Sequence, residues 1–128
     1  MTEELQKDLV RIYHRLKKIL KKYEKPLVPK FDLDSRYELW SIKNIEIDGR
    51  KKKELYFAGL IIQNKYVGFY YMPIYIDVRL KDFLKPDLLR LLKGKSCFQI
   101  KKLDENLEQQ IDEALKKGYE LYKKRGWI

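Results

Sequence analysis

The stretches Glu54-Leu-Tyr-Phe-Ala-Gly-Leu-Ile-Ile-Gln63 and Tyr66-Val-Gly-Phe-Tyr-Tyr-Met72 decide the fold of this chain. Both are rich in β-branched and aromatic residues, and only Asn64-Lys65 separates them, so together they predict a β-hairpin. Alternate residues face opposite sides of a strand, and both sides of the first stretch are apolar. We therefore expect this hairpin to lie in the middle of a sheet, with both of its faces covered.

The segments before the hairpin predict a helix and one further strand. Apolar residues at helical spacing indicate a helix over residues 2–24, with Thr2 as its N-cap. Two prolines make residues 25–30 a connection. Residues 37–47 alternate well enough for a strand with a bulge or break near Asn44, and Asp48-Gly49 is a turn signal.

The segments after the hairpin predict helical structure around one short strand. Residues 74–77 suit a short strand extension, and residues 79–92 suit helical structure that begins again at Pro86 and stops at Gly94. Residues 97–100 form the next strand. A long final helix starts at the cap residue Asp104 and ends at Gly126, with Trp127 folding back.

This order of elements predicts an α+β fold in a single domain over residues 1–128. We expect two layers, an antiparallel β-sheet with the N-terminal and C-terminal helices packed on it. A chain of 128 residues is long enough for its own hydrophobic core. One cysteine excludes an internal disulfide, and the charged N-terminus lacks the apolar stretch of a signal peptide. We therefore expect a cytoplasmic protein.

The positive charge is concentrated in the part of the chain that forms the sheet. Residues 51–102 carry 12 Lys/Arg against 4 Asp/Glu, a net charge of +8 out of +10 for the whole chain. A run of four cations, called the basic run below, begins one residue before this segment: Arg50, Lys51, Lys52 and Lys53. It predicts a module that binds an anionic partner, either nucleic acid or an acidic protein surface. The alternative is that the lysines only keep a small aromatic-rich domain soluble.

Catalytic signatures are missing, and we expect a protein without enzymatic activity. Gly94-Lys-Ser precedes a strand, whereas a phosphate-binding loop precedes a helix. Cys97 has no histidine near it in sequence, and His14 is the only histidine. Aromatic residues gather in the predicted sheet and suit either base stacking or an amphipathic core: Trp40, Tyr56, Tyr66, Tyr70, Tyr71 and Tyr75. An enzyme that uses Cys97 in a tyrosine-lined cleft is a third hypothesis.

Several motifs resemble the YdhG-like family of small bacterial proteins, known as a domain of unknown function. The resemblance covers residues 54–128 and rests on Phe57-Ala58-Gly59, Val67-Gly68-Phe69-Tyr70, Met72-Pro73-Ile74-Tyr75 and Gly94-Lys-Ser-Cys-Phe98. It implies a fold similar to frataxin, with helices on one face of an antiparallel sheet. For some members it also implies an iron chaperone that delivers ferrous iron to cluster-assembly proteins.

Frataxin-like proteins bind iron through an acidic ridge on the first helix and the sheet edge. In this chain the first helix is net basic beyond Asp8, so the iron hypothesis places its metal ligands in the last helix. Three carboxylates recur there at one helical turn and form an acidic row, namely Asp104, Glu108 and Asp112. Oxygen ligands of this kind suit a hard cation or ferrous iron. The other interpretation is that these acidic residues stabilise the helix, because negative charge in its first turns interacts favourably with the helix dipole.

Overall fold

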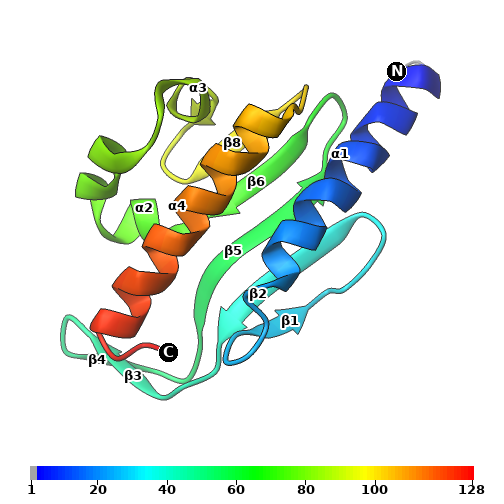
Figure 1. Cartoon of the computed structure of the whole chain (residues 1–128). Coiled ribbons are helices and arrows are strands. Elements are labelled where there is room, and N and C mark those ends of the chain that lie inside the picture. Colours follow the sequence, from blue (N-terminus) through cyan, green and yellow to red (C-terminus); the bar gives the residue numbers. More distant parts are fainter. Residues whose placement is uncertain (1–2) are drawn as a thin grey trace.

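A computed structural model describes residues 3–128 and shows two layers, helices on a sheet (Figure 1). The six-stranded sheet is antiparallel throughout, in the order β1-β2-β5-β6-β8-β7. Its strands are β1 (Val28–Lys30), β2 (Arg36–Ser41), β5 (Leu55–Ile62), β6 (Val67–Tyr71), β7 (Leu92–Lys93) and β8 (Cys97–Ile100). The predicted α+β class and the central position of the β5–β6 hairpin are confirmed.

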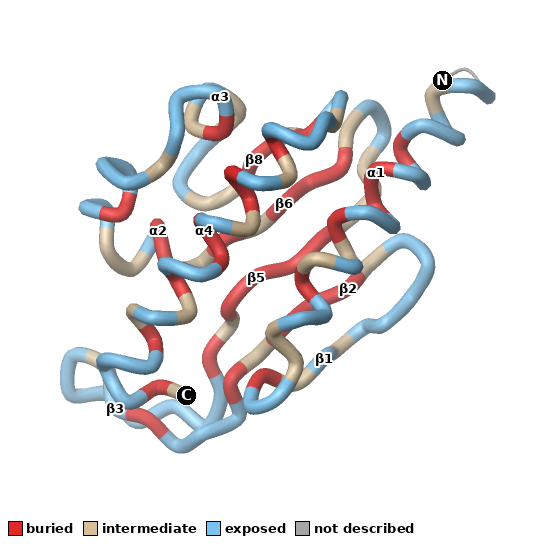
Figure 2. Tube along the Cα trace, viewed as in Figure 1, coloured by how far each residue is buried: buried red, intermediate tan, exposed pale blue. Residues whose placement is uncertain are grey.

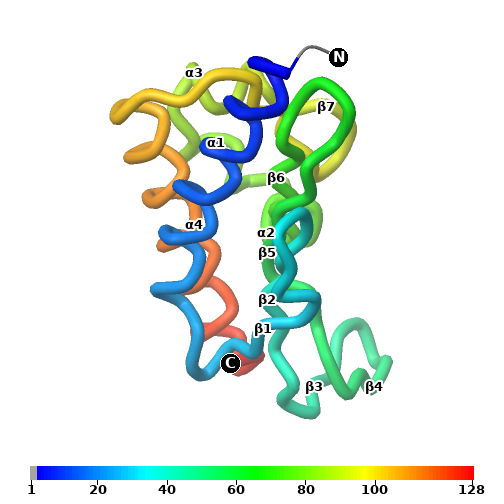
Figure 3. Tube along the Cα trace, turned by 90° about the vertical axis from the view of Figure 1, so that its right-hand side faces the viewer, coloured from blue at the N-terminus to red at the C-terminus, as the bar shows by residue number. Residues whose placement is uncertain are grey.

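Two long helices, α1 (Glu3–Lys21) and α4 (Glu105–Lys124), lie on the same side of this sheet (Figure 3). The predicted first helix is confirmed but ends earlier, and Thr2, its expected N-cap, lies outside the described residues. At the start of α4, the Asp104 side chain accepts a hydrogen bond from the Leu107 amide, as predicted. Gly126, at φ 76°, follows its last turn, and Trp127 folds back against the Tyr122 ring.

The hydrophobic core lies between the helices and the sheet. In Figure 2 the buried positions gather on the strands and on the inner faces of the helices. Tyr71 joins the layers, because its hydroxyl donates a hydrogen bond to the Ala114 carbonyl. The largest fully buried side chains are Tyr13, Tyr37, Tyr71, Tyr122, Phe57, Phe69 and Phe98.

The expectation that both faces of the hairpin are covered is wrong, because both long helices lie on one face. Side chains on the other face are half-buried, among them Trp40, Tyr56 and Tyr70. Two glycines leave room for tyrosine rings on this face. A Cβ atom at Gly59 would lie 2.1 Å from the Tyr56 hydroxyl oxygen, and one at Gly68 would lie 2.9 Å from the Tyr70 ring. The tyrosine rings thus cover backbone that a helix would otherwise cover.

Several local predictions need correction. Residues 28–30, expected in a connection, form edge strand β1, where Pro29 is tolerated because an edge strand leaves amide positions unpaired. The break expected near Asn44 is confirmed, because β2 ends at Ser41 and the next strand begins at Ile45; β2 also has an irregularity at Leu39/Trp40, opposite the extra residue Phe57. Residues 45–47 leave the main sheet as β3 (Ile45–Ile47), which pairs only with β4 (Arg50–Lys52).

The segment after β6 also differs from the prediction. Instead of a strand extension, α2 (Met72–Ile76) is a short helix with Pro73 in its first turn, where a proline removes no helical hydrogen bond. A 3₁₀ helix, η1 (Val78–Phe83), and a single turn, α3 (Pro86–Leu89), follow. Pro86 starts α3 as predicted, but Leu92 belongs to β7, and Gly94 at φ 79° turns the chain from β7 to β8.

No helix within residues 3–128 combines the length and the apolar character that crossing a membrane requires.

Candidate nucleic-acid interface

The basic run lies on a separate small hairpin at one end of the molecule. Asp48 and Gly49 form its turn with φ angles of 51° and 78°, a left-handed pair that matches the twist of a two-residue hairpin. Buried Ile45 anchors β3 to the core, whereas all of β4 is exposed. In Figure 3 this hairpin projects on the side of the sheet away from the helices.

The four cations of the basic run have no acidic partner within the described residues. Other basic side chains nearby are neutralised. Lys30, for example, pairs with Glu54, and Arg36 pairs with Glu38. The basic run therefore keeps its full charge for an external anion.

An aromatic pocket lies between this hairpin and the open face of the sheet. Its volume is about 480 Å³, and its walls combine β2, the β3–β4 hairpin, β5 and α2. The Trp40 and Tyr56 rings meet at a centroid distance of 5.1 Å and form one wall. The lining residues are Trp40, Ile47, Asp48, Lys52, Glu54, Leu55, Tyr56, Met72, Tyr75 and Ile76. Lys52 belongs to both the pocket and the basic run, so the two features are continuous.

Cations stand over the aromatic rings of this pocket. The Lys30 ammonium nitrogen is 4.6 Å from the centre of a Trp40 ring, and the Lys95 nitrogen is 5.6 Å from that of Tyr75. Tyr75 is 52% exposed, so its ring faces solvent at the pocket edge. An exposed ring beside a lysine, as at Tyr75 and Lys95, is the combination that stacks nucleobases and holds phosphates.

Glu38 fixes the orientation of the Trp40 indole. Its buried carboxylate accepts the indole N–H at 3.0 Å and two hydrogen bonds from Arg36. Sequence reasoning missed this residue, although its signal was present, because Arg36, Glu38 and Trp40 alternate and so share one strand face.

The open face also holds Cys97, but without an activating base. Burial raises the pKa of the Cys97 thiol, and its hydrogen bond with Tyr70 opposes that rise only in part. Burial likewise raises the pKa of Tyr56 and of Tyr70. His14, the only histidine, is an exposed residue of α1 whose ring contacts Tyr13. The thiol therefore stays protonated at neutral pH and is a poor nucleophile.

The acidic row lies along the contact between α4 and α1. Asp104 caps α4, and Glu108 forms a two-pronged ion pair with Arg15 at 3.0 and 2.5 Å. The Asp112 carboxylate accepts hydrogen bonds from the Lys22 ammonium group and from the Tyr23 hydroxyl, both at 3.0 Å. Across residues 3–128 no group of three His, Cys, Asp or Glu residues is placed to hold a metal ion. These partners give the row a structural role, and iron binding by it stays a prediction.

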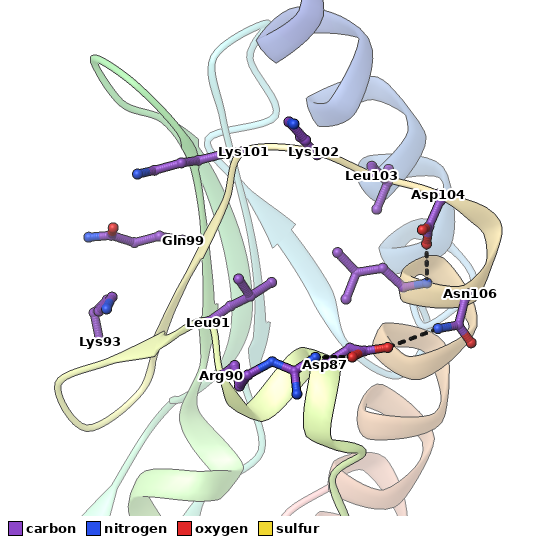
Figure 4. Close-up of a pocket in the computed structure, with 11 residues that line it drawn as sticks. Asp87, Arg90, Leu91, Lys93, Gln99, Lys101, Lys102, Leu103, Asp104 and Asn106 are labelled. Carbon is purple, nitrogen blue, oxygen red and sulfur yellow. Dashed lines mark hydrogen bonds and ion pairs between the residues drawn. The ribbon is translucent and has the colours of Figure 1, made fainter.

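A second and larger cleft lies at the N-terminal end of α4, which is the end away from the basic hairpin (Figure 4). It has a volume of about 790 Å³ and lies among α3, β7, β8 and the first turn of α4. Its lining residues are Asp87, Arg90, Leu91, Lys93, Gln99, Lys101, Lys102, Leu103, Asp104, Asn106 and Leu107. No local pattern predicted this cleft, because its walls come from four elements.

Comparisons of the chain with protein-family models, with curated proteins and with solved structures find no match.

Proposed function

We propose that the protein is a non-enzymatic module that binds single-stranded nucleic acid through the basic run and the adjoining aromatic pocket. One observation carries this proposal. The basic run, whose four cations have no acidic partner in residues 3–128, reaches through Lys52 into a pocket walled by Trp40, Tyr56 and Tyr75, on the sheet face that the long helices leave open. The cations suit the phosphates, and the rings suit the bases.

The aromatic pocket favours nucleic acid over an acidic protein surface. An acidic protein would use the lysines but gain little from the aromatic rings of Trp40 and Tyr75. A base that stacks on an aromatic side chain contributes about 1–3 kcal/mol, independently of its identity. A pocket of about 480 Å³ lies within the size range of small-ligand sites and can take one unpaired base. Bases are accessible in this way only in single strands.

The resemblance to YdhG-like proteins supports a binding role without catalysis, and a frataxin-like fold belongs to the same proposal. Both long helices on one face of an antiparallel sheet agree with that arrangement. The iron-chaperone role that the resemblance implies for some members is a separate prediction for this chain. It concerns the acidic row and not the basic run.

Fluorescence anisotropy of a labelled oligothymidylate at low salt tests the proposal, with tryptophan emission recorded in the same titration. Trp127 is only 6% exposed and packs on Tyr122, so a change in emission reports mainly on Trp40. We expect emission and anisotropy to change together, and Trp40→Leu to weaken binding by about fivefold or more. A polyglutamate peptide serves as the competing acidic partner.

Two outcomes would overturn the proposal. If the oligonucleotide does not associate even at low salt, the basic run holds no phosphates. If polyglutamate binds as well as the oligonucleotide and Trp40→Leu affects neither, the partner is an acidic surface without bases. Circular dichroism and thermal unfolding of Trp40→Leu check that the variant keeps its fold.

A further inference from the structure

The cleft at the start of α4 (Figure 4) is a second site, separate from the nucleic-acid interface. The two sites lie at opposite ends of α4. Asp104, the N-cap of α4, lines the cleft. The basic hairpin lies near the other end of α4: Ser41, the last residue of β2, donates a hydrogen bond from its hydroxyl to the carbonyl of Trp127, which follows α4. A helix of 20 residues is about 30 Å long, so a small ligand cannot touch both sites.

Hydrogen bonds between α3 and α4 hold one wall of this cleft in place. The Gln110 side chain accepts a hydrogen bond from the Leu88 amide at 3.0 Å and donates one to the Asp87 carboxylate at 3.3 Å. Asn106 donates to the same carboxylate at 3.1 Å, as Figure 4 shows. Gln110 is buried, so its hydrogen bond with the Leu88 amide is protected from water, whereas the bond between Asn106 and Asp87 is exposed. The wall is thereby organised before any ligand arrives.

The acidic groups of the cleft are used internally, whereas three of its cations are not. Asp87 accepts from Arg90, Asn106 and Gln110, and Asp104 caps α4. In the described part of the chain three lysines of the cleft form no ion pair: Lys93, Lys101 and Lys102. The positive end of the α4 dipole adds to their field. The cleft therefore favours an anion.

The remaining lining gives that anion an apolar neighbour. Leu91 and Leu103 are half-buried, and Leu107 closes the cleft against the core. β7 has only two residues, so β8 has no neighbouring strand on its β7 side beyond Gln99, and the cleft opens at this edge. A fully hydrated inorganic ion would interact with the lysines but would leave the apolar surface of the leucines exposed to water.

We infer that this cleft binds a small organic anion, in which a carboxylate or phosphate group is attached to a short apolar body. The lysines hold the charged group, and the three leucines cover the apolar part. This inference does not depend on nucleic-acid binding, because the residues involved belong to neither the basic run nor the aromatic pocket.

The test is a titration of the ¹⁵N-labelled protein by NMR with four probes: hexanoate, hexyl phosphate, inorganic phosphate and hexanol. We expect both hexyl anions to shift the amide signals of Lys93, Gln99, Leu103 and Asn106 in a saturable way, with inorganic phosphate and hexanol weaker. Whichever hexyl anion binds more tightly identifies the charged group. Lys93→Gln with Lys102→Gln should weaken binding by about threefold or more.

The control variant carries Lys123→Gln with Lys124→Gln in the last turn of the same helix, which removes the same charge at exposed positions. It should bind as the unaltered protein does. The inference is overturned if neither hexyl anion gives saturable shifts of these amide signals up to about 10 mM. It is also overturned if both double variants weaken binding equally, because attraction would then reflect overall charge alone.

Discussion

Replacing the basic run with glutamine should remove most of the salt dependence of oligonucleotide binding. The perturbation is Arg50, Lys51, Lys52 and Lys53→Gln, which keeps side-chain length and polarity but removes four charges. All four positions are exposed and without ion pairs in residues 3–128, so folding stability should change by less than about 0.5 kcal/mol. Any change in binding then reports on phosphate contacts.

The structure sets the size of the effect. Four unpaired cations can neutralise four phosphates at most, and each contact on a single strand contributes about −0.7 to the slope of log K against log salt. The unaltered protein should therefore show a slope near −2.8, and its affinity should fall about 50-fold between roughly 50 and 200 mM salt. In the glutamine variant the slope should approach zero.

Anisotropy titrations at several salt concentrations measure both slopes. The matched control removes one arginine and three lysines from exposed positions of the helical layer, as Lys7, Arg11, Lys18 and Lys116→Gln. Both variants lose the same net charge, so they differ only in where the charge stood. If the control flattens the slope as much as the basic-run variant does, or if the basic-run variant keeps its slope, the assignment of phosphates to this hairpin is refuted.

Three further predictions concern the core, the thiol and the acidic row. Gly118→Ala should destabilise the protein by about 1–2 kcal/mol in urea unfolding despite the better helix propensity of alanine, because its Cβ would lie 2.6 Å from the Tyr71 hydroxyl and 2.7 Å from Pro73; a stabilised variant would show that the helix is free to shift. Alkylation of native Cys97 should be slow at neutral pH and accelerate only above the usual thiol range, because burial raises its pKa; rapid reaction at pH 7 would contradict this. For the iron hypothesis, anaerobic ferrous titration should show weak saturable binding that is lost when the acidic row is changed to asparagine and glutamine; no binding by the native protein would end that hypothesis, and equal binding by both would place the site elsewhere.

Much of the fold could be predicted because its signals are local. Apolar spacing located both long helices, and the Asn64-Lys65 turn between two β-rich runs located the central hairpin. Asp104 and Gly126 marked the ends of α4 through capping chemistry that depends on a few neighbouring residues. The short elements after β6 were less predictable. A five-residue segment such as α2 has little propensity of its own, and its contacts with β5 and α4 decide its form.

The candidate site could be predicted only in part. The basic run was evident from consecutive residues, and its exposure follows from its charge. The pocket beside it was not evident, because Trp40, Tyr56 and Tyr75 come from β2, β5 and α2. Apolar residues on both sides of β5 predicted cover on both faces. In the structure the tyrosine rings lie over Gly59 and Gly68 and supply part of that cover themselves.

The sequence by itself determined the helices, the central hairpin and the concentration of positive charge in the sheet segment, because periodicity, turn chemistry and charge act over a few residues. Only the tertiary structure decided which charges remain free. Arg15 of α1 and Lys22, directly after α1, meet the acidic row through contacts that span about 90 residues of sequence, whereas within residues 3–128 the basic run and the lysines of the cleft meet no acid. Whether a charged side chain is paired depends on which segments the fold brings within 4 Å, and no local pattern contains that information.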